Sequence, residues 1–142
     1  MAGRGKRAFS ARFSAGVVDA LEQRSAVVGQ TKSQLAERLI DEGLRTDEFP
    51  GVMFRSGPTG RRAGLVGGPD IWEIVRDING AKAEGADDPL KQVSDVTGLP
   101  LNGVRLAFSY YISYPEDVDQ RILLAEERAA RMQRALGAAS VA

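Results

Sequence analysis

The chain has 142 residues, with 43% hydrophobic and 27% charged side chains and equal numbers of acids and bases. This length and composition fit one or two small domains with a buried core. Neither cysteine nor histidine is present, which excludes disulfides, thiolate metal sites and the commonest general base. There is no phosphate-binding glycine motif, no signal peptide and no apolar run near the ~20 residues of a membrane span. We therefore expect a cytoplasmic protein that is not an enzyme and uses no cofactor.

Charge is distributed unevenly along the chain. Residues 1–14 carry four basic side chains and no acid, whereas residues 46–142 carry 11 bases and 14 acids. The basic side chains of the first segment are those of Arg4, Lys6, Arg7 and Arg12. This asymmetry is typical of an arm that contacts nucleic-acid phosphates, although a solvated arm without a partner has the same composition.

A short strand is expected over residues 8–13, where the side chains alternate with a period of two. One face of this strand carries Phe9, Ala11 and Phe13, and the other face carries Ala8, Ser10 and Arg12. Ser14 follows as the expected N-cap of a helix, because its hydroxyl can accept a free amide of the first turn.

Two helices follow the strand. The first has apolar residues at helical spacing up to Val28, and Gly29 fits the left-handed position just past its end. Thr31 opens the second helix, and Gln34 three residues later completes a capping box. The apolar stripe of this second helix runs to Leu44.

Residues 6–45 are too few to bury enough surface alone, and a lone strand leaves both of its edges unpaired. Two copies that pair their strands antiparallel remove both difficulties, because four helices then enclose one core. The outward strand face becomes a two-stranded ribbon of a size that enters the DNA major groove. The residues expected in the shared dimer core are Phe9, Ala11, Phe13, Leu21, Leu35 and Leu39.

Residues 6–44 resemble the ribbon-helix-helix DNA-binding family, the MetJ/Arc/CopG repressors and many bacterial antitoxins. The resemblance rests on KRAFSARFS from Lys6, GQTKSQL from Gly29 and EGL from Glu42. It implies that the outward strand residues contact bases, namely Ala8, Ser10 and Arg12. It also implies phosphate contacts at the start of the second helix, from Thr31, Lys32 and Ser33, beside those of the arm residues Arg4, Lys6 and Arg7. Ala8 stands where the family often has a polar reader, so Ser10 and Arg12 would carry more of the readout. In the alternative, the ribbon serves only to dimerise.

A linker is expected over residues 46–50, followed by a second module over residues 51–115. Residues 52–55 and 61–66 predict a hairpin around a turn-rich segment. Asp70, with Glu73 three residues later, starts a helix that ends before a loop over residues 80–88. Two short helices then flank the tight turn at residues 97–100. This order predicts a winged helix-turn-helix domain.

Residues 51–122 resemble the domain of unknown function found in VapB-like antitoxins that are encoded beside PIN-like toxins. The matching stretches are PGVMFR from Pro50, GRRA from Gly60, GPDIWEIV from Gly68, NGVR from Asn102 and YYISYP from Tyr110. As a second DNA reader, this domain would use Arg55, Arg61, Arg62, Asn102 and Arg105. As a partner-binding domain it would use the aromatic run Tyr110, Tyr111 and Tyr114, although such runs are more often core. Seven bases and seven acids across residues 50–115 favour neither interpretation.

A last helix is expected from Pro115, within a segment 116–142 whose tail frays after Gly137. Acids in its first turns and arginines towards its other end complement the helix dipole. An apolar seam with spacings of four and three follows Val118, Ile122, Ala125, Ala129, Met132 and Leu136. Such a seam indicates either a coiled-coil-like dimer contact or a helix that lies on its own domain.

The sequence therefore predicts a mainly α fold with short β elements, in which a basic arm and ribbon-helix-helix module occupy residues 1–45. The expected function is a sequence-specific transcriptional regulator of the antitoxin-type autorepressor class. It would act as a homodimer on double-stranded DNA, with a PIN-like toxin as a further partner. The alternative is a toxin-neutralising, partner-binding protein in which the first module mainly dimerises.

Overall fold

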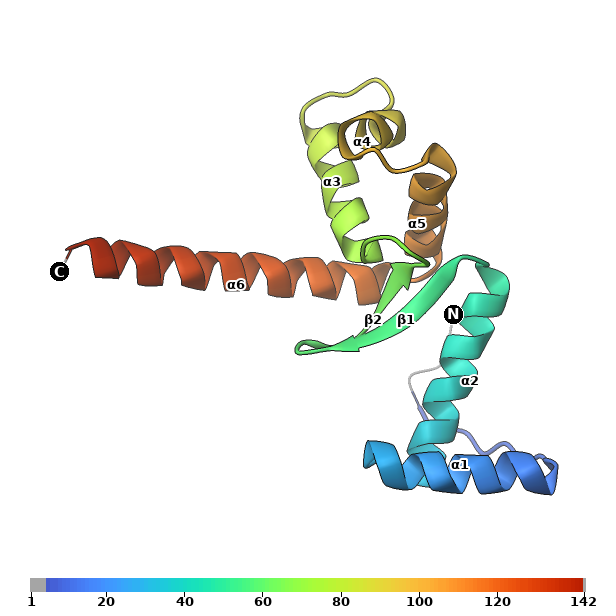
Figure 1. Ribbon diagram of the computed structural model, residues 1–142. Coiled ribbons are helices and arrows are strands. Elements are labelled where there is room, and N and C mark those ends of the chain that lie inside the picture. Colours follow the sequence, from blue (N-terminus) through green and yellow to red (C-terminus); the bar gives the residue numbers. More distant parts are fainter. Residues whose placement is uncertain (1–4, 142) are drawn as a thin grey trace. The chain divides into compact units, whose positions relative to one another are not determined.

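A computed structural model describes residues 5–141 and contains six helices and one antiparallel hairpin (Figure 1). The expectation of a mainly α fold with short β elements is confirmed. The chain divides into two compact units, residues 1–44 and residues 45–142. No helix in the described part of the chain combines the length and the apolar character that crossing a bilayer requires.

Unit 1 consists of an irregular segment and two helices, α1 (Ala15–Val28) and most of α2 (Lys32–Glu48). Gly29 ends α1 in the left-handed conformation, with φ 70°, as predicted. The capping box at α2 is also confirmed, because the Thr31 amide donates to the Gln34 side chain and the Gln34 amide donates to the Thr31 hydroxyl. Ser14 is the N-cap of α1, but its hydroxyl makes no capping hydrogen bond, contrary to expectation.

The strand predicted over residues 8–13 is not formed within the single chain. Residues 5–14 have no regular secondary structure, and the one sheet among the described residues is the hairpin of unit 2. A strand is defined by hydrogen bonds to a neighbour, and this chain supplies no neighbour to the segment. The pairing on which the ribbon depends therefore needs a second copy.

Unit 2 begins at the last turn of α2 and continues into the hairpin β1 (Val52–Gly57) and β2 (Gly60–Leu65). Four helices follow: α3 (Ile71–Ala83), α4 (Pro89–Thr97), α5 (Leu101–Ser113) and α6 (Pro115–Val141). Three helix ends differ from expectation. Helix α2 continues to Glu48, so most of the expected linker is helical, and α3 extends into the segment predicted as a loop. Helix α6 continues to Val141, past Gly137, after which the tail was expected to fray.

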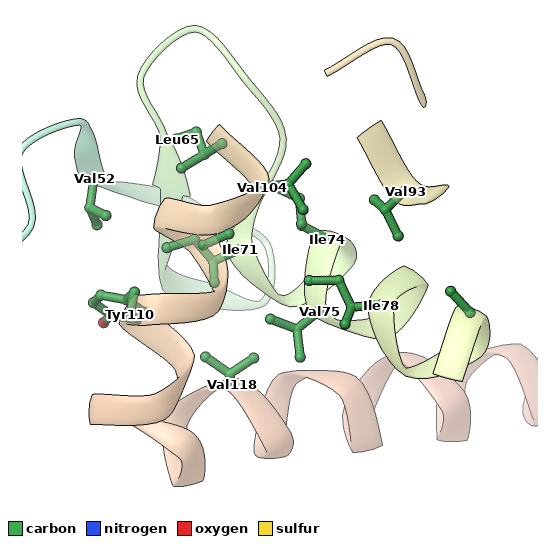
Figure 2. Close-up of a cluster of buried hydrophobic side chains, with 12 residues drawn as sticks. Val52, Leu65, Ile71, Ile74, Val75, Ile78, Val93, Val104, Tyr110 and Val118 are labelled. Carbon is green, nitrogen blue, oxygen red and sulfur yellow. The ribbon is translucent and has the colours of Figure 1, made fainter. Parts of the chain in front are cut away.

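The core of unit 2 is built around α3, whose buried side chains face α5 and the start of α6 (Figure 2). Ile74, Val75 and Ile78 are at most 1% exposed, as are Val104 and Tyr110 of α5. Val118, the first residue of the predicted α6 seam, is also buried in this core. The start of α6 therefore lies on its own domain.

The later part of α6 is different, since nearly every residue after Ala125 is exposed. Met132 and Leu136 of the seam are each 64% exposed. This chain therefore covers the start of the seam, at Val118 and Ile122, and leaves its later residues exposed.

Candidate nucleic-acid interface

The N-terminal segment presents its side chains to solvent on both of the predicted faces. Phe9 is 83% exposed and Phe13 is 58% exposed, and Ala11 is exposed as well. The predicted base-contacting residues Ala8, Ser10 and Arg12 are likewise exposed. Arg4, predicted to contact phosphate, lies outside the described residues. This irregular segment of ten residues therefore exposes two large aromatic side chains, which form an apolar surface without a partner.

This segment borders a groove of about 1350 Å³ whose other wall is α2. Phe9, Ala11 and Phe13 line one side of it, and the residues contributed by α2 include Ala36, Ile40 and Leu44. Ile40 and Leu44 are 48% and 65% exposed, so the groove is open and has apolar side chains on both walls, beside charged ones that include Lys6 and Glu37. It has the dimensions and chemistry to take apolar side chains from a second chain.

The predicted dimer core is only partly assembled by one chain. Leu35 is fully buried and Leu21 is half-buried, whereas Leu39 is 46% exposed. Leu35 is the only buried residue among the described residues of unit 1. A module held by a single buried leucine lacks the burial that offsets the entropy of ordering its chain.

The start of α2 has the features of a phosphate site. The capping box uses the amides of Thr31 and Gln34, which leaves those of Lys32 and Ser33 at the positive end of the helix dipole. The side chain of Lys32 is 3.2 Å from Glu22, and Lys6 is 2.9 Å from Glu37, in two exposed ion pairs. Such pairs contribute little to stability, so either lysine can turn to a phosphate at small cost.

In unit 2, two of the three hairpin arginines predicted to contact phosphate, Arg55 and Arg62, are used inside the domain, whereas Arg61 donates from Nη1 to the hydroxyl of Ser56 at 2.9 Å in an exposed hydrogen bond. Arg55 Nη2 lies 3.2 Å from Asp70 Oδ1, and Arg62 Nε donates a hydrogen bond to Asp70 Oδ2. Trp72 Nε1 donates to the same oxygen at 3.3 Å. Because Asp70 is only 9% exposed, its charge is available to these neighbours rather than to solvent. The hairpin thus offers DNA less free positive charge than the sequence suggested.

Sequence reasoning missed this Arg55–Asp70–Arg62 cluster, although a signal for it exists. Each guanidinium lies over a glycine on the opposite strand, Arg55 over Gly64 and Arg62 over Gly57, where any Cβ would collide with it. The arginines themselves are cross-strand partners. An Arg–Gly pattern on both strands of a predicted hairpin, followed by an aspartate cap, is the signature that could have indicated it.

The two helices predicted on either side of the turn at residues 97–100 are present as α4 and α5. Asp88 caps α4 by accepting a hydrogen bond from the Lys91 amide at 3.2 Å, with Pro89 in the first turn. Helix α5 buries Val104, Ala107 and Tyr110. Its exposed stripe consists of Asn102, Arg105, Ser109 and Ile112. The two predicted base-contacting residues of α5 therefore share its solvent-facing side.

The aromatic run at the end of α5 belongs to the core, at least in its first member. Tyr110 is 1% exposed and accepts a hydrogen bond from Arg45 Nη1 at 3.0 Å, while the same nitrogen donates to Asp117 at 2.5 Å. Burial lowers the pKa of Arg45, but the hydrogen bonds with Tyr110 and Asp117 raise it by more. The net shift of the pKa is upward, so this guanidinium stays charged. Tyr114 packs beneath Arg45, with 4.0 Å between the guanidinium carbon and the ring centroid.

Among residues 5–140, no three acidic side chains lie close enough together to hold a metal ion. A scan against protein-family models finds no matching family, and searches of curated proteins and of solved structures find no match either. The function must therefore be inferred from the residues and geometry of this chain.

Proposed function

We propose that the chain is a homodimeric, sequence-specific DNA-binding regulator of transcription. Two copies of residues 8–13 pair as antiparallel strands, and the α1 and α2 helices of both chains enclose one core. The observation that carries this proposal is the mismatch within unit 1, where Leu35 is buried while Phe9, Phe13 and Leu39 are exposed. A second copy is the partner that covers all of these side chains by one symmetric contact.

Pairing fixes the direction of the remaining side chains. When Phe9, Ala11 and Phe13 turn to the shared core, the alternation of a strand turns Ala8, Ser10 and Arg12 outward. A two-stranded ribbon fits the major groove, where an arginine can bond two acceptors of guanine. Among the described residues Arg12 has no ion-pair partner, so its charge is available to DNA.

Phosphate contacts would come from two places on unit 1. Lys6 and Arg7 precede the ribbon, and the free amides of Lys32 and Ser33 mark the start of α2. Contacts of this kind set the position of the ribbon on the duplex and carry no sequence information. In unit 2, Asn102 and Arg105 of α5 would add a second, weaker set of contacts.

By the resemblances of both modules, the regulator would be an antitoxin that represses its own promoter. One observation favours the alternative, a protein that neutralises a toxin and uses the ribbon mainly to dimerise. Helix α6 exposes Met132 and Leu136, which lie four residues apart on one face beyond the domain core, and an apolar helical face of this kind suits a protein partner such as a PIN-like toxin.

The direct experiment is a gel-shift titration of the full-length protein on its own promoter DNA and on scrambled duplex. Arg12→Ala should weaken operator binding by about 1–3 kcal/mol and relax sequence preference, because a base contact is lost. Arg24→Ala, which removes the same charge from an exposed position on α1, is the matched control. If Arg12→Ala leaves operator preference intact, the ribbon does not read bases and the partner-binding alternative gains.

A further inference from the structure

Unit 2 contains a pocket of about 430 Å³ between the turn of the hairpin, the start of α3 and the middle of α6. Four arginines from three different elements line it, and they are Arg62, Arg76, Arg121 and Arg128. We call this the arginine pocket. Trp72 and the apolar side chains of Leu124 and Ala125 complete its wall. Of these four arginines, only Arg62 was among the predicted site residues.

The lining of the arginine pocket is strongly unbalanced in charge. Four guanidinium groups face one acid, Asp70, which already lies between Arg55 and Arg62. Arg76 has a long 3.4 Å contact with its neighbour Asp77, and Asp77 does not line the pocket. Arg128 has no ion pair with any described residue. Four like charges with this little compensation repel one another, and a bound anion would relieve that repulsion.

Uncharged groups hold two of these four side chains in place. Arg121 donates from Nη1 to the carbonyl of Thr59 and from Nη2 to the carbonyl of Arg61, both at 2.5 Å. The guanidinium of Arg76 lies 5.2 Å from the centroid of the Trp72 ring. Carbonyls and an indole fix a guanidinium without neutralising it, so the positive charge is positioned in advance and remains available.

We propose that the arginine pocket binds a phosphate-bearing ligand. Planar guanidinium groups match phosphate oxygens in pairs of parallel hydrogen bonds, and an excess of several positive charges suits a multiply charged anion better than a carboxylate. The ligand is either a free phosphorylated small molecule or the phosphodiester backbone of nucleic acid, since both present the same oxygens. The arginine pocket does not depend on formation of the ribbon, because every residue that lines it belongs to unit 2.

The test uses full-length protein and sodium pyrophosphate, titrated by calorimetry at constant ionic strength. The variant Arg76→Gln with Arg128→Gln removes two exposed guanidinium groups, of which that of Arg76 contacts only the partly buried ring of Trp72 and the exposed side chain of Asp77. Its matched control is Arg131→Gln with Arg134→Gln, which removes two exposed charges from α6 outside the pocket. A second arm measures binding to random-sequence duplex DNA as a function of salt.

If the ligand is a free phosphorylated molecule, wild type and control bind pyrophosphate alike, and the pocket variant binds about tenfold more weakly or worse. If the ligand is a phosphodiester, the pocket variant loses duplex affinity and its log–log salt slope falls by about 2, while the control changes less. The proposal is overturned if the pocket variant matches wild type in both arms, or if the control loses as much as the pocket variant. If the wild-type protein binds pyrophosphate but shows no preference for operator over scrambled duplex, that result would count against the proposed function alone.

Discussion

The two units of this chain treat their apolar side chains in opposite ways. In unit 2, 12 buried residues from the hairpin and four helices form one cluster (Figure 2). In the described part of unit 1, Leu35 is buried and the large side chains of Phe9, Phe13, Val17 and Leu44 are more than half exposed. Both units contain a helix that starts with a capping box, at Thr31 in unit 1 and at Asp70 in unit 2, so local structure does not explain the difference. Unit 2 closes its core within one chain, whereas unit 1 leaves most of its large apolar side chains uncovered.

This difference means that the two units should respond differently to dilution. The stability of unit 2 is a property of one chain, whereas that of a shared core depends on protomer concentration. The single tryptophan and all three tyrosines lie in unit 2, so near-ultraviolet signals report on unit 2 alone. Sedimentation reports on unit 1, if unit 1 forms the dimer.

The largest effect is expected from Phe9→Ser combined with Phe13→Ser. Removing both aromatic rings from the proposed shared core should convert the dimer into a monomer and abolish operator binding, because the ribbon no longer forms. Sedimentation velocity measures the first change and a gel shift the second. Tryptophan fluorescence should stay native because unit 2 is untouched. Val27→Ser, at a 74% exposed position of α1 outside the groove, is the control. A double variant that remains dimeric would falsify the shared-core interpretation.

A similar deletion in unit 2 should act within one chain. Ile74→Ala removes a side chain that is 1% exposed and should lower the free energy of unfolding by about 2–5 kcal/mol, because it leaves a cavity in a closed core. Thermal unfolding followed by tryptophan fluorescence gives the value, which should not depend on protein concentration. Leu136→Ala, at an exposed position of α6, should change it little. A concentration-dependent loss for Ile74→Ala would contradict the view that unit 2 is self-sufficient.

The Arg55–Asp70–Arg62 cluster gives a smaller, electrostatic test of the same unit. Asp70→Asn should destabilise unit 2 by about 3 kcal/mol, because two largely buried guanidinium groups lose their only counter-charge among the described residues. Arg55 Nε and Arg62 Nη1 already lack a hydrogen-bond acceptor there, and the carbonyl of Gly68, which accepts from Arg55 Nη2 at 2.9 Å, carries no charge that could replace that of Asp70. Urea denaturation measures the loss. Asp95→Asn, which removes an exposed pair with Lys91, should be neutral. Equal effects of both variants would show that the cluster is not structural.

The smallest effect is a dependence of stability on alkaline pH. Burial raises the pKa of Tyr110, against the opposing effect of its hydrogen bond with Arg45. A raised pKa means that the fold favours the neutral phenol, so this contribution is complete below the unfolded value of about 10 and is lost as the pH rises past it. Stability of unit 2 should therefore decline above about pH 10, and Tyr110→Phe should flatten this decline while losing the Arg45 hydrogen bond. Tyr111→Phe, at a more exposed ring, is the comparison. An unchanged alkaline profile in Tyr110→Phe would refute the assignment to Tyr110.

Much of the local structure could be predicted from the sequence. The capping boxes at Thr31 and Asp70, the left-handed Gly29 and the turn before Pro100 were all identified correctly, because capping and turn formation depend on residues within a few positions of one another. The fold class followed from the same local patterns. Errors concerned helix ends. Helix α2 runs past its predicted limit and meets no glycine or proline until Pro50, whereas α3 and α6 continue through Gly80 and Gly137, where the sequence predicted that they would end or fray.

The candidate sites were harder to predict because they depend on distant residues. The arrangement of Arg55, Arg62 and Asp70 results from strand register and from glycines that leave room for guanidinium groups. The arginine pocket joins the hairpin, α3 and α6, so its members are up to 66 positions apart, from Arg62 to Arg128. No spacing rule links such positions.

The sequence by itself determined the order of the elements, their caps, and the parity that places Phe9 and Phe13 opposite Ser10 and Arg12. These features are local and follow from backbone geometry. Only the tertiary structure decided which side chains are covered. Val118 at the start of the α6 seam is buried by unit 2, Arg55 and Arg62 of the hairpin share the single counter-charge of Asp70, and the apolar face of unit 1 stays open. Burial and charge neutralisation are set by what packs against a residue, and that is decided by the whole fold and not by the neighbours of that residue in the chain.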